Sequence, residues 1–144
     1  MKALSFKELL ETDLLTIVLA AGSRYLGPCY IGIELLLRLS SDFPAVESVW
    51  RKLAQSKATH QRRITIVAVQ DERASFALAQ DLVRTAIRDH SAKVRLFAVG
   101  TILIRYMDLL LPEIIAQARV EKDPEVLCIQ WVIQHMSNGE ATPQ

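Results

Sequence analysis

The chain has 144 residues, of which 51% are hydrophobic and 23% charged, with only five glycines and five prolines. This composition excludes a disordered chain and fits one domain with one sizeable core. The net charge of +1 is the sum of −2 over residues 1–50, +7 over residues 51–106 and −4 over residues 107–144. The basic middle could attract an acidic partner or a phosphate backbone, although charge blocks on helices usually only solvate a face.

The apolar runs and the cysteines predict a soluble, cytoplasmic protein. Charged residues interrupt the first apolar run, which excludes a signal peptide, and the longest charge-free apolar stretch, from Leu14 to Ala21, is too short to cross a bilayer. Cys29 and Cys128 match no metal or redox spacing. We therefore expect both to be buried free thiols in a reducing compartment.

Helical periodicity dominates the chain, whereas strand signals are weak. The expected helices cover, in chain order, about residues 5–21, 29–39, 43–56, 59–70, 74–88, 92–106, 109–121 and 124–136. Ser5 and Glu8 form a capping box for the first helix, Gly27-Pro28 separates the first helix from the second, and Asp42 is a candidate N-cap of the third. Residues 1–136 should form one helical domain, followed by a flexible polar tail over residues 137–144.

Large apolar side chains fall on the inward faces of these helices. In the fifth helix the inward set includes Phe76, and in the third and eighth we expect the two tryptophans, Trp50 and Trp131, to lie in the core.

The segment from Asp89 to Ala98 carries the clearest motif. An Asp is followed by Val-Arg five and six residues later, and by Ala three residues after the Arg. This pattern resembles the start of the first helix of a HEAT repeat. In that family the Asp lies in the turn between repeats, and the Arg reaches toward it. The resemblance therefore implies a contact between Arg95 and Asp89, and a close helix approach at Ala98.

Weaker copies of the motif lie on either side, at equal distances along the chain. Asp123 to Val126 resembles the same turn, with Val126 in the place of Val94, although Leu127 and Gln130 replace the Arg and the Ala. Arg63 and Leu127 lie at equal distances along the chain before and after Arg95. Arg63 is therefore the counterpart of Arg95 on the N-terminal side, but no Asp lies in the turn before it. The stretch from Leu110 to Ile115 resembles the second helix of a HEAT unit. A period of this length is typical of stacked helical pairs.

The resemblance covers about residues 57–136 and implies an all-α fold, a short right-handed α-solenoid of about eight antiparallel helices. The part before it shows no consensus positions, as expected of a capping region. An irregular helical bundle is the alternative. HEAT-like proteins are usually scaffolds for protein–protein contact, but some bind nucleic acid, and a few helical-repeat proteins are DNA glycosylases or chromophore lyases.

No pattern for catalysis, cofactor binding or metal binding stands out. Gly22 to Cys29 begins like a P-loop but lacks the Lys and the Ser or Thr that would contact phosphate and magnesium. The three histidines lack partners at the spacing of a metal site. A glycosylase-type site would have to combine Asp81 with Trp50. We expect no enzyme, no cofactor, no metal and no small-molecule substrate.

In a HEAT-like stack the second helix of each pair lines the concave side, which here means the third, fifth and seventh helices. Their polar stripes form a mixed-charge face, which Glu121 would extend. The candidate partner-binding residues on it are Glu47, Arg51, Gln55, Asp81, Arg84, Arg88, Glu113 and Gln117. This face is either a recognition surface or a solvated face with helical ion pairs. Arg24 and Tyr25, in the loop from Gly22 to Pro28, offer a second candidate surface.

The sequence thus predicts a module that binds another protein, and an immunity-type inhibitor that neutralises a partner toxin or enzyme is one form of it. The alternative is a nucleic-acid-binding protein that uses the basic middle segment. A self-associating structural protein is a third option.

Overall fold

The computed structural model describes residues 11–21 and 23–137. The expected capping box at Ser5 and Glu8 lies outside the described residues, and so does the tail beyond residue 137. The described helices are α1 (Glu11–Ala21), α2 (Leu26–Ser40), α3 (Ala45–Ala54), α4 (Thr59–Ala68), α5 (Phe76–Ala86), α6 (Ala92–Arg105), α7 (Leu111–Ala118) and α8 (Pro124–Ser137), with a 3-10 turn, η2 (Asp108–Leu110), before α7. No strand occurs among these residues, so the prediction of an all-helical chain is confirmed.

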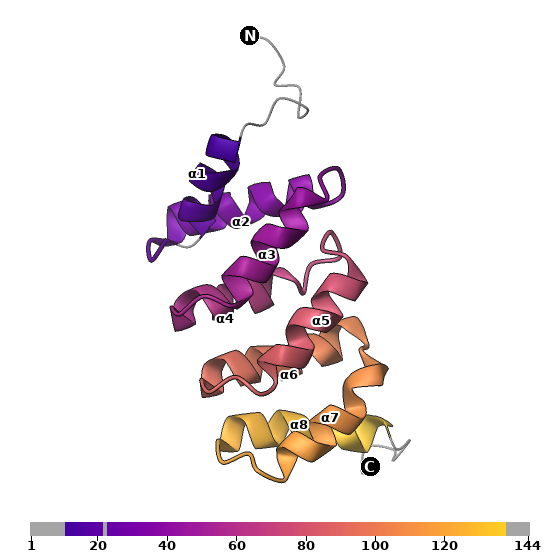
Figure 1. Cartoon of the computed structure of the whole chain (residues 1–144). Coiled ribbons are helices and arrows are strands. Elements are labelled where there is room, and N and C mark those ends of the chain that lie inside the picture. Colours follow the sequence, from indigo (N-terminus) through magenta and orange to yellow (C-terminus); the bar gives the residue numbers. More distant parts are fainter. Residues whose placement is uncertain (1–10, 22, 138–144) are drawn as a thin grey trace.

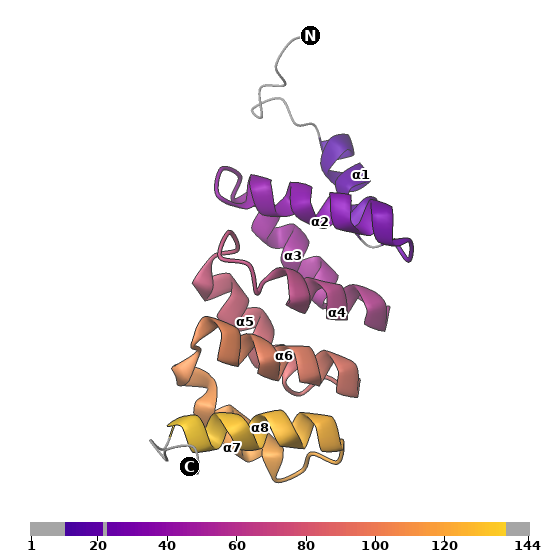
Figure 2. The same ribbon diagram turned by 180° about the vertical axis from the view of Figure 1, so that it is seen from behind.

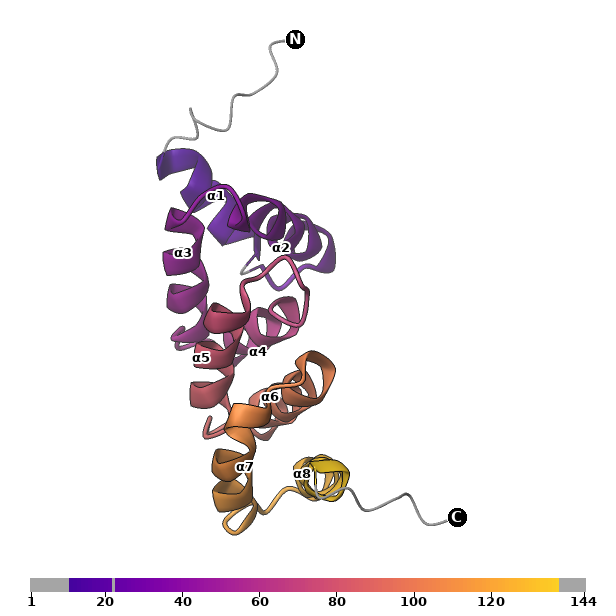
Figure 3. The same ribbon diagram turned by 90° about the vertical axis from the view of Figure 1, so that its right-hand side faces the viewer.

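The helices are arranged in two layers. Figure 3 shows α1, α3, α5 and α7 in one layer, called the odd layer below, and α2, α4, α6 and α8 in the other, called the even layer. Successive helix pairs follow one another along the stack, with α1 at one end and α7 and α8 at the other (Figure 1). In the even layer α4 packs against α6 and α6 against α8 (Figure 2). No helix in the described part is long and apolar enough to span a membrane.

The starts of three helices bear on the sequence predictions. α2 begins at Leu26, so Gly27-Pro28 lies in its first turn and is not part of the loop between the first two helices. Proline is tolerated there because the first N–H groups of a helix have no partner within the helix. The N-cap of α3 is Pro44, so the expectation for Asp42 was wrong. At α8, the Asp123 carboxylate accepts hydrogen bonds from the backbone N–H groups that follow, at 3.0 and 3.2 Å.

The core runs between the two layers and contains Trp50, which is fully buried and donates its indole N–H to Ser40 Oγ at 3.1 Å. Trp131 is 57% exposed and Phe76 is 43% exposed, so their core assignments were wrong. The Arg105 guanidinium covers the Phe76 ring at 5.6 Å from its centroid, a cation–π contact.

The two cysteines differ. Cys29 is a buried free thiol, as expected, and donates to the Ala21 carbonyl oxygen at the end of α1 at 3.2 Å. Cys128 is free but exposed on α8, which corrects the expectation.

Helices α1 and α2 approach each other closely at one glycine. A Cβ added to Gly32 would collide with the backbone nitrogen of Ala21 and lie 2.7 Å from its Cα. Only glycine permits this contact between the two backbones.

Candidate functional site

Five of the eight predicted binding residues form one continuous series of ion pairs across the odd layer. Arg51 contacts Glu47 at 2.9 Å within α3 and Asp81 of α5 at 3.2 Å. Arg84 contacts Asp81 at 3.8 Å within α5 and Glu113 of α7 at 3.2 Å. We call these residues the charge ladder. Its side chains are 26–49% exposed, so the ladder lies on an open surface. Negative and positive side chains alternate along it.

The other three predicted residues border the charge ladder and take no part in its ion pairs. Gln55 is exposed at the C-cap of α3, and Arg88 is exposed just beyond the end of α5. Gln117 is half-buried on α7. All eight residues therefore belong to the odd layer or its helix ends. That this layer is the concave side stays a prediction.

A buried arginine connects the second helix pair of the stack to the third. Arg62 of α4 binds both carboxylate oxygens of Asp89, with Nε–Oδ2 at 2.8 Å and Nη2–Oδ1 at 3.1 Å. Its Nη1 also donates to the carbonyl oxygens of Ser56 and Lys57 at 2.8 and 3.2 Å. Arg62 thus fixes the turn before its own helix and the turn before the next even-layer helix. We call this arrangement the first clamp.

The same arrangement recurs one unit later and forms the second clamp. Arg95 of α6 binds both carboxylate oxygens of Glu121 at 2.8 Å, and its Nη1 donates to the Asp89 carbonyl oxygen at 2.8 Å. In both clamps the guanidinium binds a carbonyl oxygen six residues earlier, and it binds a carboxylate 27 or 26 residues later. The two arginines are therefore structurally equivalent.

The clamps correct three expectations. The counterpart of Arg95 is Arg62, and not its neighbour Arg63. Arg95 does reach Asp89, but it binds the backbone carbonyl because the Asp89 carboxylate is already bound by Arg62. Glu121 does not extend the exposed stripe, because its side chain is only 1% exposed.

Both clamp carboxylates are held in the charged form. Burial raises the pKa of Asp89, but the hydrogen bonds from Arg62 and from the Ser91 N–H outweigh it, so the pKa lies below its usual value. The hydrogen bonds from Arg95 lower the pKa of Glu121 against the opposing effect of burial. Groups ionised so firmly are structural anions and are unsuited to proton transfer near neutral pH.

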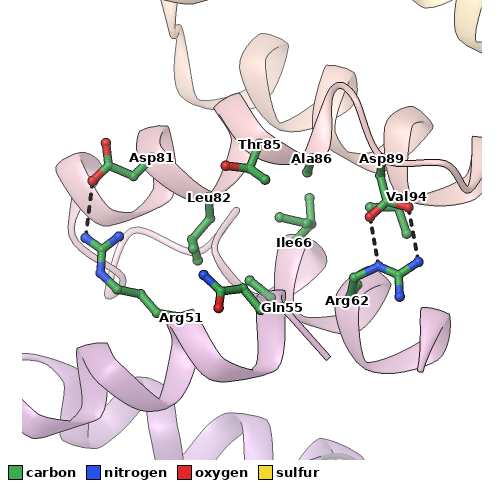
Figure 4. A pocket seen from close by; sticks show the side chains of 11 residues that line it. Arg51, Gln55, Arg62, Ile66, Asp81, Leu82, Thr85, Ala86, Asp89 and Val94 are labelled. Atoms are coloured by element: carbon green, nitrogen blue, oxygen red, sulfur yellow. Dashed lines mark hydrogen bonds and ion pairs between the residues drawn. The ribbon is translucent and has the colours of Figure 1, made fainter. Parts of the chain in front are cut away.

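A small cavity of about 90 Å³ lies between one contact of the charge ladder and the first clamp. Figure 4 shows the Arg51–Asp81 pair at one side and the Arg62–Asp89 pair at the other, with Leu82 and Ile66 between them. This volume admits a few water molecules, whereas sites for small-molecule ligands are commonly several hundred Å³.

The glycosylase-type combination of Asp81 with Trp50 is not formed. The Trp50 ring is fully buried and cannot line an open groove, and Asp81 is paired with Arg51 and Arg84. Among the described residues no group of three His, Cys, Asp or Glu side chains could hold a metal ion. In the loop before α2, Arg24 and Tyr25 are exposed, as expected.

Sequence reasoning missed Arg62 and Glu121 as partners of the two clamps. One signal could have found Arg62: if the turn between the two units is allowed one extra residue, Gln61-Arg62 aligns with Val94-Arg95.

Comparison of the chain with protein-family models, with curated proteins and with solved structures finds no match.

Proposed function

We propose that this chain is a short α-solenoid of HEAT-like helical pairs that binds another protein through the odd layer, with the charge ladder at the centre of the interface. The observation that carries the proposal is that Glu47, Arg51, Asp81, Arg84 and Glu113 meet in one exposed line across three helices. The two equivalent clamps support the repeat assignment, since a repeat predicts the same contact in successive units.

The geometry of the ladder favours a protein partner. Each arginine is held by two carboxylates, so its side chain is already ordered and loses little conformational entropy when a partner binds. Alternating charges fix the register of a partner and exclude surfaces whose charges do not match. The ladder would therefore contribute specificity, while Gln55, Arg88 and Gln117 around it would supply further hydrogen bonds.

An inhibitor of the immunity type fits this description. Such a protein needs a rigid surface that covers the active site of one enzyme or toxin, and it needs no chemistry of its own. The expected complex is one-to-one, with nanomolar affinity that survives moderate salt.

A pair of matched double variants tests the proposal. Asp81→Asn with Arg84→Gln removes one negative and one positive charge from the ladder, so the net charge is unchanged. Glu34→Gln with Arg73→Gln likewise removes one negative and one positive charge, from an exposed pair outside the ladder in which Arg73 Nη1 lies 2.7 Å from Glu34 Oε1. A partner captured by the wild type should be retained by the Glu34/Arg73 variant. The ladder variant should bind it at least 100-fold more weakly in calorimetry with the purified partner. Equal binding by both variants would remove the ladder from the interface.

Nucleic acid is the second candidate, and three exposed basic residues favour it: Lys57 before α4, Arg88 before α6 and Lys93 in the first turn of α6. Against it, five of the eleven basic residues in the middle segment pair with carboxylates, namely Arg51, Arg62, Arg73, Arg84 and Arg95. Binding to labelled DNA or RNA that weakens steeply with salt, and that Arg88→Ala reduces, would support this candidate. Absence of binding at 50 mM salt would dismiss it.

A further inference from the structure

The turns that lead into the four even-layer helices lie along one edge of the stack, opposite the turns that lead into α3, α5 and α7 (Figure 1). Contacts join these turns in series. His60 Nε2 of α4 lies 2.8 Å from the Ser23 carbonyl oxygen in the turn before α2. Arg62 binds the turn before α4 and the turn before α6, and Arg95 binds the turn before α6 and the turn before α8. The four turns therefore form one continuous edge, which we call the turn edge.

The same position in each of these turns holds a basic side chain or a histidine. The residue two places before the start of each even-layer helix is exposed, and it is, in chain order, Arg24, Lys57, His90 and Lys122. Arg88 and Lys93, on either side of His90, are exposed as well. A cation thus recurs along the turn edge with the period of the helix pairs.

The cations of the turn edge are unpaired, whereas its clamp carboxylates are neutralised. Asp89 is bound by Arg62 and Glu121 by Arg95. Five cations form no ion pair within residues 11–21 and 23–137, and we call them the basic row: Arg24, Lys57, Arg88, Lys93 and Lys122. Glu125, exposed in the first turn of α8, opposes the positive charge at that end. The positive charge is therefore greatest over the turns before α4 and α6.

The basic row is a line of charges and not a broad patch. Helices α4, α6 and α8 pack on one another, and packed helices lie about 8–10 Å apart, so the row advances by about that distance from turn to turn. Such a row fits a chain of regularly spaced negative charges. A single phosphodiester strand carries one negative charge per nucleotide and can bend to follow the row. The strands of a duplex wind around its axis, so their phosphates turn away from a straight row.

An exposed aromatic ring stands at the start of the basic row. Tyr25, next to Arg24, is 79% exposed. Its backbone is fixed at the N-cap of α2, where its N–H donates to Ser23 Oγ at 3.1 Å. An aromatic ring beside a track of cations suits a single strand, because every base has a face that can stack on the ring. Anionic lipids and acidic peptides have no bases to stack there.

We propose that the turn edge binds single-stranded nucleic acid, with the phosphodiester backbone along the basic row and one base stacked on Tyr25. The inference rests on nucleic-acid binding, the second candidate function above, and adds to it the form of the strand and the edge that binds it. The charge ladder lies on the odd layer, so a protein partner and a strand would use different surfaces, with Arg88 between them.

Fluorescence anisotropy with the full chain and labelled oligonucleotides of about 12 nucleotides tests the proposal. An oligothymidine strand should bind with a dissociation constant on the order of 1–100 µM at low salt, and at least 10-fold more tightly than a duplex of the same length. Each phosphate contact on a single strand contributes about −0.7 to the slope of log association constant against log salt. If all five cations contribute, the slope should be about −3.5.

Single substitutions separate the basic row from general charge. Lys57→Gln and Lys93→Gln should each weaken binding at least 3-fold and make the salt slope less steep by about 0.7. Arg38→Gln is the matched control, because it also removes one positive charge, from a side chain 69% exposed at the opposite end of α2, and it should change affinity less than 2-fold. Tyr25→Leu should weaken binding at least 5-fold, whereas Tyr25→Phe should bind like the wild type, because the ring and not the hydroxyl stacks.

Five results would overturn the proposal: no binding at 50 mM salt, a duplex bound as tightly as the single strand, equal losses for Arg38→Gln and Lys57→Gln, full binding by Tyr25→Leu, or displacement of the strand by phosphatidylserine vesicles at equal negative charge. Only the first of these also removes nucleic acid as the second candidate. The Asp81→Asn, Arg84→Gln ladder variant should bind the strand like the wild type. Loss of partner binding in that variant with strand binding intact would show that the two surfaces act separately.

Discussion

Replacing Arg95 by methionine should destabilise the fold far more than the same change at Arg51. Arg95→Met keeps much of the length and packing of the side chain but removes its hydrogen bonds to the Glu121 carboxylate and to the Asp89 carbonyl oxygen. Glu121 would remain with a side chain only 1% exposed and without its cation. An uncompensated buried charge of this kind costs about 3–5 kcal/mol. At about 4 °C per kcal/mol for a chain of this size, the melting temperature should fall by about 12–20 °C.

Arg51→Met provides the contrast. Arg51 also contacts two carboxylates, but all three side chains are 43–49% exposed, and solvent screens pairs so open, so the loss should be small. The double variant Arg95→Met with Glu121→Leu leaves no uncompensated buried charge at the second clamp, so its stability should lie above that of Arg95→Met alone.

Urea unfolding followed by circular dichroism at 222 nm measures all three variants against the wild type. Hydrogen exchange should locate the effect of Arg95→Met in α7 and α8, the helices that the second clamp connects to α6. The reasoning is refuted if Arg95→Met costs no more than Arg51→Met, or if the double variant is the least stable of the three.

The remaining predictions concern pH and packing. The pKa values of Asp89 and Glu121 are lowered in the folded state. The stability that these two carboxylates contribute is therefore present above their unfolded-state pKa values, near 4, and is lost as the pH falls through their folded-state pKa values. The urea midpoint of unfolding should drop below about pH 5, and a midpoint that stays constant down to pH 3 would contradict this. Gln130 is 1% exposed and neither amide atom has a partner, so Gln130→Leu should raise the unfolding free energy by about 1–3 kcal/mol, and a loss of stability would show that the amide is satisfied. Gly32→Ala should destabilise the fold by about 1–3 kcal/mol, because the added Cβ forces α1 away from α2. Gly100→Ala should stabilise α6 by about 0.5–1 kcal/mol, because nothing lies within 4 Å of its added Cβ. Melting temperatures that shift in the same direction in both variants would argue against the close crossing of α1 and α2.

Local sequence signals were enough for the helices. The resemblance to HEAT repeats pointed to the third, fifth and seventh of them, and the 3.6-residue period then selected the candidate residues on each, because side chains three and four positions apart share a helix face. The period could not show that Arg51 reaches Asp81 or that Arg84 reaches Glu113. Those contacts depend on how far α3, α5 and α7 slide along one another, which is set by core packing and not by any one helix.

The errors have related physical causes. One extra residue in a turn moves the repeat position from Arg63 to Arg62, and a side chain one position further along a helix points about 100° away. Trp131 reads as core because large apolar side chains usually lie on the inward face of a helix, yet its burial depends on what packs against that part of α8, which the sequence of α8 does not contain; the residue is 57% exposed. Pro28 reads as a break because proline disrupts helix interiors, but at the first turn it is compatible with the helix.

The two clamps make the chain extensible by duplication. The segment from Arg62 to Val94 holds one arginine and, at Asp89, the acid that this arginine binds. A second copy of this segment inserted after Val94 would place a new arginine before a new acid, and every guanidinium would still meet a carboxylate one unit later. In the proposed solenoid, length could then change by whole helix pairs, because each unit of a solenoid contacts only its neighbours. A unit inserted with Leu at the arginine position would lack this ion pair to the unit after it, because Leu, as at Leu127, has no guanidinium.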